Sequence, residues 1–525
     1  MSRDTDRVAR GARSVTLAVL LSRLLGLVRE QVLAGLFGAG LQMDAYVVAY
    51  RLPNLLRDLL AEGAFASAFV TVFSHTREKE GLDRTWQLAS RALSCLLLIV
   101  GLLVLLGEGL APYLVRLLAP GFVSNPEKLS LATLLTRIMF PFLALVSLSA
   151  VFGGMLNTFG YFFVPAISSA FFNLVSVGVG VVLYFWLKAQ GVTPIVGMAC
   201  GVIAGGLAQV LIQWPLLRRI GFRFRFAPLF QDPGVREIFR LMGPMVLGFS
   251  AIQLNVFVNT YFASLCGEGA VSWLSYAFRV MYVPLGLFGV ALSLALLPVA
   301  AAQAAQGAFG ELRKTYVSSL LMGLSLALPS AVGLIILSEP IIRLLFERGR
   351  FTAFDTKQTA LALSLFALSL PAYATTKVTT PIFYALKKPR VPMLSSFVSV
   401  GVNLLVVLST LHSLGFRAVA LATASGIITQ ALLQVSILYQ ILKGFPLRRL
   451  LSGFLRLLLS AAVMGLVAFW LNSRLSSLTT LKLLFALLGS ILLCALTYFA
   501  ISALLGPHEA LYLFRSLKKS PARKD

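Results

Sequence analysis

Long apolar runs recur along almost the whole chain, and short polar stretches separate them. The runs are continuous rather than alternating and are about 20 residues long, which is the length of a membrane-spanning helix. In lipid a helix satisfies its own backbone hydrogen bonds within one segment. The pattern therefore predicts an all-α integral membrane protein. We expect about fourteen transmembrane helices, at 14–38, 43–75, 88–106, 129–154, 161–187, 193–217, 236–265, 269–303, 315–337, 356–384, 391–411, 416–442, 454–472 and 482–505.

Prolines inside several predicted spans lead us to expect kinks, because proline removes a backbone hydrogen bond from a helix. The expected kinks lie at Pro53, Pro141, Pro284 and Pro371.

Three short patterns recur in the same order in the two halves of the chain, which indicates an internal duplication of six helices. The pairs are Ala49-Tyr50-Arg51 with Ala277-Phe278-Arg279, Val164-Pro165 with Val391-Pro392, and Gly205, Gln209 and Gln213 with Gly426, Gln430 and Gln434. Their offsets are 228, 227 and 221 residues. An offset of six spans gives both halves the same topology, so we expect two pseudo-symmetric six-helix lobes related by an axis along the membrane normal.

The last two spans fall outside this duplication and form an addition. The predicted organisation is a cytoplasmic N-terminal tail (1–13), a first lobe of helices 1–6 (14–217), a basic cytoplasmic linker (218–235), a second lobe of helices 7–12 (236–442), helices 13–14 (443–505) and a basic cytoplasmic tail (506–525).

The composition agrees with a membrane protein: 58% of the 525 residues are hydrophobic and only 12% are charged, against about 25% in soluble domains. The net charge of +25 is explained by loops held inside next to anionic lipid, rather than by nucleic-acid binding. Most Lys and Arg residues lie in the loops that an inside N-terminus makes cytoplasmic. We therefore expect a multi-pass membrane protein with both termini in the cytoplasm.

The cysteines and histidines predict no metal site and no cofactor. Cys95, Cys200, Cys266 and Cys494 lie in apolar runs without paired spacing, and the three histidines form no cluster. Small apolar packing residues are the simplest interpretation of these cysteines.

Charged residues inside the spans are the candidates for function, because a charge in the membrane interior is costly and usually faces a polar cavity or a partner. They concentrate in the first two spans. The set comprises Arg23, Arg29, Glu30, Asp44, Arg51, Arg57, Asp58 and Glu62, with Arg279 in span eight and Lys377 in span ten.

Three interpretations of these charges are open. They can be buried ion pairs that lock helices together, or side chains that reach to the membrane surface, which we favour for Asp44 and Arg137. They can also line a cationic cavity between the lobes. Arginine suits a cavity that binds a diphosphate, because its planar fork matches two phosphate oxygens at a time.

The same residues carry a family resemblance. The stretch from Ser22 to Glu30 (SRLLGLVRE), Asp44-Ala45-Tyr46, and the stretches 52–57 (LPNLLR) and 61–65 (AEGAF) resemble the first two helices of the lipid II flippases (MurJ/MviN). Tyr276-Ala277-Phe278-Arg279 and Gly349-Arg350-Phe351-Thr352 are similar to later patterns of that family. This family belongs to the multidrug/oligosaccharidyl-lipid/polysaccharide exporter superfamily.

The resemblance implies a fourteen-helix flippase of the bacterial plasma (inner) membrane. Such a flippase moves lipid II, the undecaprenyl-diphosphate-linked peptidoglycan precursor, from the inner to the outer leaflet by alternating access. It implies substrate-binding arginines at Arg23, Arg29, Arg57 and Arg279. It also implies a lipid-tail groove on the last two helices, where Ala461, Gly465, Ala486 and Gly489 are small residues. Supporting acidic residues are expected at Glu30, Asp44 and Glu62.

Two departures from the family pattern affect the ionic surroundings of Arg279. Acidic residues found next to this arginine and three residues after it in some members are Phe278 and Tyr282 here. The cavity is therefore expected to be more positive.

Several alternatives remain open. A polysaccharide-lipid flippase of the same superfamily would also handle a lipid diphosphate, whereas a drug-cation exporter should line its cavity with carboxylates. A membrane glycosyltransferase needs a catalytic carboxylate, and the loops near 107–128 and 338–355 contain no evident acid/base pair, so we expect a transporter and not an enzyme. Proton, sodium or membrane potential could drive it. Other cell-wall synthesis proteins are possible partners.

Overall fold

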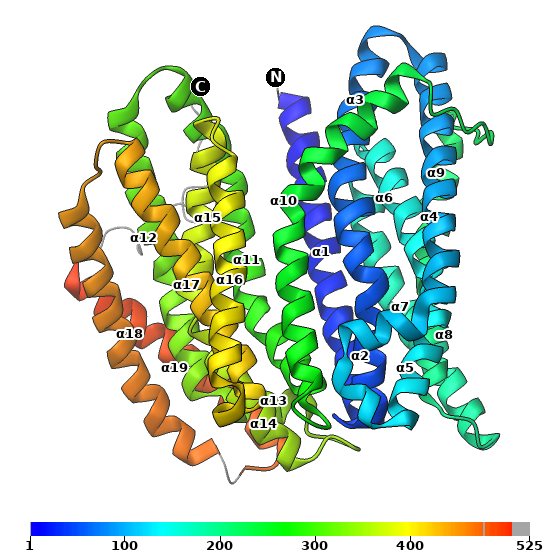
Figure 1. The fold of residues 1–525 in the computed structure, drawn as a ribbon. Helices are drawn as coiled ribbons and strands as arrows, with labels where there is room; N and C mark the ends of the chain where they lie inside the picture. Colours follow the sequence, from blue (N-terminus) through cyan, green and yellow to red (C-terminus); the bar gives the residue numbers. More distant parts are fainter. Residues whose placement is uncertain (1, 476–477, 507–525) are drawn as a thin grey trace. The chain divides into compact units, whose positions relative to one another are not determined.

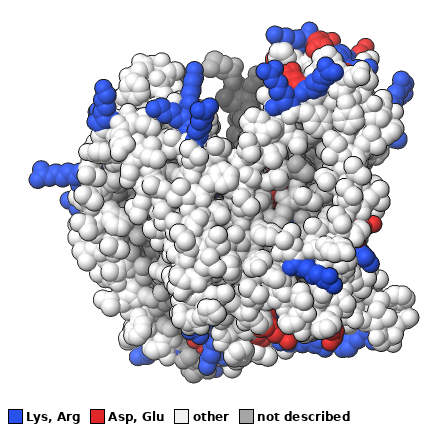
Figure 2. Space-filling view, in the orientation of Figure 1, with Lys and Arg blue, Asp and Glu red and all other residues white. Residues whose placement is uncertain are grey.

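The computed structural model describes residues 2–475 and 478–506, except for the side chains of residues 2–14, 16, 60–62, 287, 288, 290 and 291. Every regular element in the described part of the chain is a helix (Figure 1). This confirms the all-α membrane fold that the apolar runs predict. On the face shown in Figure 2, most charged side chains lie near the ends of helices, and the helix middles present uncharged surface.

The chain packs into two compact units, Met1–Ser272 and Trp273–Asp525. The helices that belong to the first unit are α1 (Ser2–Phe37), α2 (Leu41–Leu56), the π-helix η1 (Arg57–Phe65), α3 (Ala66–Lys79), α4 (Leu82–Leu118), the 3-10 helix η2 (Pro120–Ser124), α5 (Pro126–Met139), α6 (Phe142–Thr158), α7 (Phe163–Ala189), α8 (Ile195–Leu211), α9 (Trp214–Arg219) and α10 (Pro233–Ser264).

Helix α11 (Ala270–Ala305) begins in the first unit and continues into the second. The other helices of the second unit are α12 (Phe309–Ile336), α13 (Ser338–Phe346), α14 (Ala353–Ala367), α15 (Leu370–Ala385), α16 (Arg390–Leu414), α17 (Phe416–Ile441), α18 (Leu447–Leu475) and α19 (Thr480–Leu505). Helix α10 packs within the first unit, whereas the sequence repeat groups it with the second half of the chain.

Ten helices in the described residues are long and apolar enough to cross a membrane, or eleven when the bent pair α14–α15 counts as one span. The remaining predicted spans fall on α1, on the run from α2 to α3, and on α11. The count of fourteen therefore stays a prediction. The bend of 41° between α14 and α15 confirms the kink expected at Pro371, whereas Pro284 lies inside a helix that continues to Ala305.

The internal duplication is visible in the start of two helices. Val164 and Pro165 are the second and third residues of α7, and Val391 and Pro392 hold the same places in α16. In each helix a serine hydroxyl three residues later donates a hydrogen bond to the proline carbonyl, over 2.7 Å in α7 and 2.9 Å in α16.

In each half the following helix, α8 or α17, packs closely on the helix before it at an equivalent glycine. A methyl group added at Gly205 of α8 would lie 2.7 Å from the carbonyl oxygen of Phe172 in α7. A methyl group at Gly426 of α17 would lie 2.7 Å from the carbonyl oxygen of Ser399 in α16. Small residues allow such close backbone contact between helices in membranes. One helix pair of the predicted duplication, α7 with α8 and α16 with α17, is thus built alike in the two units. The duplication of all six helices stays a prediction.

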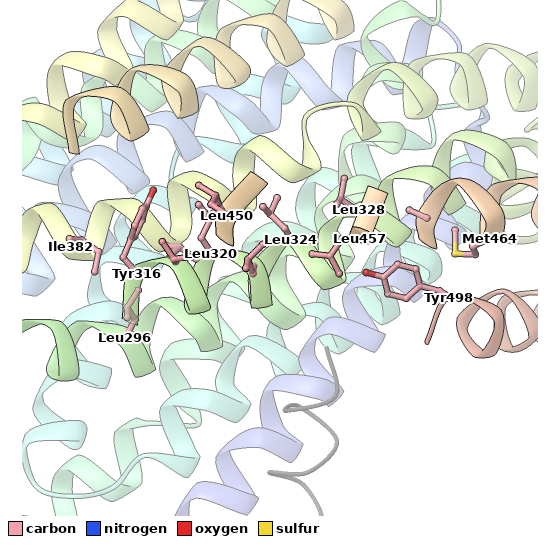
Figure 3. Packing of buried hydrophobic residues seen from close by; sticks show 14 of the residues in the cluster. Leu296, Tyr316, Leu320, Leu324, Leu328, Ile382, Leu450, Leu457, Met464 and Tyr498 are labelled. Carbon is pink, nitrogen blue, oxygen red and sulfur yellow. The ribbon is translucent and has the colours of Figure 1, made fainter. Parts of the chain in front are cut away.

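The core of the second unit joins the additional helix α18 to α12 (Figure 3). Leu320, Leu324 and Leu328 of α12 contribute to one buried cluster with Leu457 and Met464 of α18. Between helices in lipid, van der Waals packing is the main attraction, since the lipid tails are as apolar as leucine. Helix α18 is therefore an integral part of the second unit.

The linker predicted at 218–235 is held along α4 rather than left free. Phe222 is fully buried, with its ring centroid 5.5 Å from that of Trp86. The Ala227 amide donates to the Ser94 hydroxyl over 3.0 Å. At the end of the linker, Asp232 caps the first turn of α10 by accepting hydrogen bonds from Gly234 and Val235.

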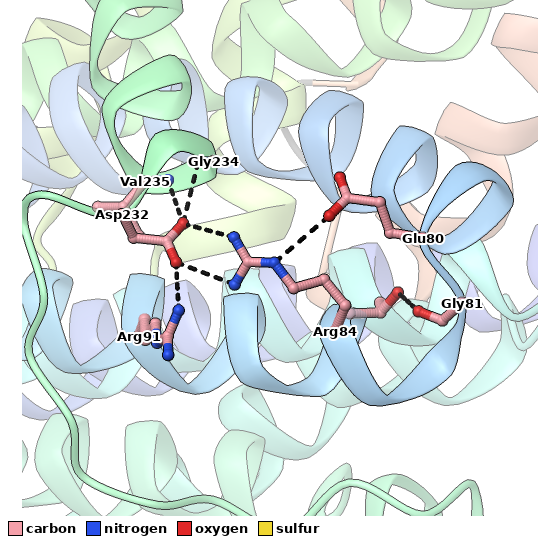
Figure 4. Close-up of polar contacts among 8 residues, drawn as sticks. Glu80, Gly81, Arg84, Arg91, Asp232, Gly234 and Val235 are labelled. Carbon is pink, nitrogen blue, oxygen red and sulfur yellow. Dashed lines mark hydrogen bonds and ion pairs between the residues drawn. The ribbon is translucent and has the colours of Figure 1, made fainter.

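Asp232 is also the centre of an ion cluster (Figure 4). Arg84 donates to both of its carboxylate oxygens, over 2.9 and 3.1 Å, and Arg91 donates to one of them. Burial by itself disfavours the ionised carboxylate, but the hydrogen bonds and charges of the two arginines outweigh it and lower the pKa of Asp232 to about 2. The cluster therefore fixes the start of α10 to α4.

Candidate functional site

Arg29 is buried in the first unit beside a carboxylate and two rings. Its guanidinium Nη2 lies 3.1 Å from Oε1 of Glu30, and both side chains are almost fully buried. Its Cζ lies 5.7 Å from the centre of the Tyr50 ring and 5.5 Å from that of Phe172. Stacking on aromatic faces and pairing with a carboxylate are the contacts that a buried guanidinium favours.

Arg23 lies two turns before Arg29 on α1 and is exposed. Beside Arg23, α1 packs on α7, where the Asn173 amide donates to the Ser22 carbonyl over 3.1 Å. A methyl group at Gly26 would lie 3.5 Å from the same amide nitrogen. Helix α1 continues through this contact without a break, and the added methyl group would stand at an ordinary van der Waals distance.

Arg57 begins a π-helical segment, η1, which continues directly from α2. Its Nε and Nη2 donate to Oδ1 of Asp58 over 2.9 and 2.7 Å. The Gln253 amide of α10 lies 3.4 Å from the other carboxylate oxygen of Asp58. Asp58 thus links Arg57 to α10, and both members of the ion pair are partly exposed.

The π-helix depends on a glycine. A methyl group at Gly63 would lie 2.2 Å from the carbonyl oxygen of Asp58 and 3.2 Å from the Phe249 ring of α10. Only glycine fits between the widened turn and α10. Single π-helical turns are rare and are frequent at functional sites, so this segment is a feature of the candidate site.

Asp44 is fully buried, so the prediction that it reaches to the membrane surface is wrong. Its Oδ2 accepts from Nζ of Lys128 over 2.6 Å and from the Gly269 amide over 2.8 Å. Its Oδ1 accepts from the amide and the hydroxyl of Ser272, over 2.9 and 2.6 Å. Four donors keep the carboxylate satisfied inside the protein. Arg137, by contrast, is exposed, and its reach to the membrane surface stays a prediction.

Asp44 and Glu268 form a reciprocal pair of helix caps. Asp44, in the first turn of α2, accepts from the first turn of α11, while Glu268, just before α11, accepts from the Leu41 amide at the start of α2 over 2.8 Å. Positions 44 and 272 differ by the repeat offset of 228. Acidic side chains stabilise helix N-termini, and here each of two related helices caps the other.

Two further residues of the predicted set lie on α2 and α11. Arg51 is half-buried and donates to the Thr260 hydroxyl of α10. Arg279 is half-buried in the second unit, where the neighbouring Phe278 ring packs 5.6 Å from that of Phe366. Because Arg279 and the other three candidate arginines belong to different units, their convergence stays a prediction. The side chain of Glu62 lies outside the described residues.

The small residues expected to line a lipid-tail groove divide into two groups. Ala461 is fully buried, and a methyl group at Gly465 would lie 2.9 Å from the Val332 side chain of α12, so the prediction that these two face a groove is wrong. Ala486 is half-buried on α19, and a methyl group at Gly489 would meet no atom within 4 Å. Only the α19 positions are compatible with an accessible surface.

Sequence reasoning missed the partners of two acidic residues. Lys128 lies 84 residues from Asp44, at the end of the predicted loop 107–128. The pair Asn125-Pro126 is a helix-start signal, however, and the structure places Lys128 in the first turn of α5. Asp232 precedes a proline and a glycine, which marks a helix start, but nothing in its neighbourhood indicates Arg84 and Arg91.

Comparison with known proteins identifies close relatives. The family model for the lipid II flippase MurJ matches residues 33–489. A probable lipid II flippase MurJ of Rhizobium meliloti (strain 1021) is 35% identical over 510 residues, covering 96% of this chain and 95% of that protein. A probable lipid II flippase MurJ of Bdellovibrio bacteriovorus is 33% identical over 520 residues, with 98% of each chain covered.

Solved structures show the same fold. The structure of a lipid II flippase MurJ in an inward closed conformation matches with a TM-score of 0.76 and 26% identity, over 96% of this chain and 99% of that chain. An inward-facing multidrug resistance transporter of the MATE family matches with a TM-score of 0.67 and 14% identity, over 80% of this chain and 95% of that chain. Because the family model and the sequence relatives both span most of its length, the chain belongs to the lipid II flippase MurJ family.

Proposed function

We propose that this protein moves lipid II from the inner to the outer leaflet of the bacterial plasma membrane by alternating access. The observation that carries the proposal is the family membership over nearly the full length of the chain. Relatives are named as flippases, so the proposed activity is transport and not an enzymatic reaction. Both termini would lie in the cytoplasm, which the distribution of Lys and Arg supports.

The arginines of the first unit support an anionic substrate. Arg29 and Arg57 are each held by the acidic residue that follows them, Glu30 and Asp58. A diphosphate that binds these guanidinium groups would take the place of the carboxylates, so that the number of charge-assisted hydrogen bonds changes little. Such an exchange allows tight but reversible binding, which a transporter needs. In this proposal Arg23, Arg29, Arg57 and Arg279 bind the diphosphate.

The lipid tail requires a separate apolar path, because each CH₂ group transferred to a polar site costs about 0.8 kcal/mol. The exposed part of α19, where Gly489 leaves open space, supports a tail site on that helix. Helix α18 would hold this site in place through its packing on α12.

A polysaccharide-lipid flippase or a multidrug exporter of the same superfamily is the alternative. The likeness to the MATE transporter is one of fold, at 14% identity. The cations inside the first two spans favour an anionic over a cationic substrate. Other cell-wall synthesis proteins are proposed partners on the ground that lipid II is consumed in wall synthesis.

Reconstitution in liposomes with labelled lipid II tests the proposal. The purified protein should move lipid II between leaflets, and Arg57→Lys, which keeps the charge but loses the fork, should reduce the rate by roughly tenfold or more. Arg137→Lys is the matched control, because Arg137 is exposed and donates only to the Glu108 carbonyl among the contacts described for it. A wild-type protein that leaves lipid II in its original leaflet would refute the proposal.

A further inference from the structure

Lys377 is a cation in the middle of the second unit that the proposed diphosphate site does not use. It lies on α15 and is half-buried. A methyl group at Gly289 of α11 would lie 3.5 Å from Cγ of Lys377, so the stem of the lysine rests against α11. Among the described residues, none forms a hydrogen bond or an ion pair with its amine.

The acidic residues of the second unit do not explain this lysine. In the described part of the unit they are Glu311, Glu339, Glu347 and Asp355, and all four lie at or near the first turn of α12, α13 or α14, or just after α13. Neither α11 nor α15 contains a carboxylate. The side chains next to Gly289 that the structure leaves undescribed are Leu287, Phe288, Val290 and Ala291, none of which carries a charge.

Two tyrosines extend this site by about one turn. Tyr373 precedes Lys377 by four residues and thus lies on the same face of α15. The phenol of Tyr373 interacts electrostatically with that of Tyr282 on α11. Tyr282 and Gly289 are seven residues apart and share a face of α11.

We propose that Lys377, together with the hydroxyl groups of Tyr282 and Tyr373, binds an acidic group of the transported lipid. The inference rests on the proposed function and deepens it. An ammonium that is half-buried and finds no carboxylate partner among the described residues is costly in the membrane interior. A phosphate or a carboxylate is the complementary group, since each accepts from an ammonium and from phenols.

Lys377 and Arg279 lie against different parts of α11. Arg279 precedes Gly289 by ten residues, which corresponds to roughly 15 Å along the helix axis. Both residues lie on one side of α11, within about 80° of each other. Lys377 therefore contacts a second acidic group, or the far phosphate of an extended diphosphate, rather than the oxygens that Arg279 holds.

Binding measurements on the full-length protein in nanodiscs test the inference. Lys377→Gln should weaken the binding of lipid II on the order of tenfold, and Lys377→Arg should restore most of it. Lys388→Gln, an exposed lysine just after the same helix, is the matched control and should bind as wild type. Undecaprenyl diphosphate without sugar and peptide is the second ligand: an equal loss assigns Lys377 to the diphosphate, and a loss with lipid II alone assigns it to a carboxylate of the peptide.

A second measurement does not depend on the variant. Lipid II should protect Lys377, but not Lys388, from reductive methylation in the wild-type protein, as read by peptide mass spectrometry. Unchanged affinity of Lys377→Gln for both ligands, or no protection of Lys377, would overturn the inference. That outcome leaves the proposed function standing as long as the wild-type protein moves lipid II in liposomes.

Discussion

Replacing Lys128 with methionine should strongly destabilise the first unit. The lysine is one of four donors to a carboxylate that has no exposure to solvent. Its own side chain is 6% exposed and also packs with Nζ 4.4 Å from the centre of the Phe122 ring. Methionine conserves the length and the apolar stem of the side chain, so the variant removes the charge and leaves the packing nearly intact.

The size of the effect follows from the environment of the pair. Breaking a buried ion pair by removing one partner costs about 3–5 kcal/mol, because the other charge stays buried. Three donors, the amides of Gly269 and Ser272 and the Ser272 hydroxyl, remain on Asp44. We therefore expect the lower end, about 3 kcal/mol, or a fall in Tm of roughly 6–12 °C for a unit of this size.

Thermal unfolding of the purified protein, followed by intrinsic fluorescence, measures this shift. Lys314→Met is the matched control: it breaks the Lys314–Glu311 pair, whose side chains are 64% and 63% exposed, and exposed pairs contribute about 0–1 kcal/mol. The double variant Lys128→Met/Asp44→Asn should lose less stability than the sum of the two single variants, because the isolated charge is gone. Equal Tm values for the Lys128→Met and Lys314→Met variants would refute the reasoning.

Three further outcomes are expected. Stability contributed by Asp232 is fully present above about pH 5 and is lost as the pH falls towards 2, because its pKa is about 2 in the folded protein against 3.8 otherwise. Asp232→Asn should remove about 2 kcal/mol of this acid dependence, measured by unfolding between pH 5 and 2. Gly205→Ala and Gly426→Ala should each destabilise the protein by about 1–3 kcal/mol, whereas Gly178→Ala and Gly401→Ala, whose added methyl groups meet no atom within 4 Å, should not; thermal unfolding of the four variants would contradict this if all behaved alike. Gly465→Leu should destabilise the second unit, while Gly489→Leu should keep its Tm and slow the movement of full-length lipid II more than that of a short-chain analogue in the liposome assay.

Features encoded by local sequence could be predicted. Apolar runs gave the helices, and the recurring Val-Pro pairs and glycines gave the duplication, because helix starts and close helix contacts require particular residue types at fixed positions. The family patterns around Arg29 and Arg57 likewise identified residues that the structure places in unusual surroundings, beside rings and on a π-helix.

Pairings between distant residues could not be predicted in this way. Asp44 meets Lys128, and Asp232 meets Arg84 and Arg91, across 84, 148 and 141 residues. Apolar periodicity says which segments are helices but not which faces meet, and an acidic residue near a span end suits either a surface position or a buried pair. The prediction that Ala461 and Gly465 face a lipid-tail groove is wrong for a related reason. A small residue such as Gly465 is equally suited to close helix packing and to an open surface.

The π-helix changes how the segment Arg57–Phe65 should respond to a change in length. A turn closed by i to i+5 hydrogen bonds holds one residue more than an α-helical turn. Deleting one residue here would let the segment close as an ordinary α-helix, so that the helices on both sides would nearly keep their facing. The face of α3 that packs on α6 would then stay turned towards its partner. The same deletion inside α3 would rotate everything that follows by roughly 100°, so a one-residue deletion should disturb the packing less in the π-helix than in the α-helix after it.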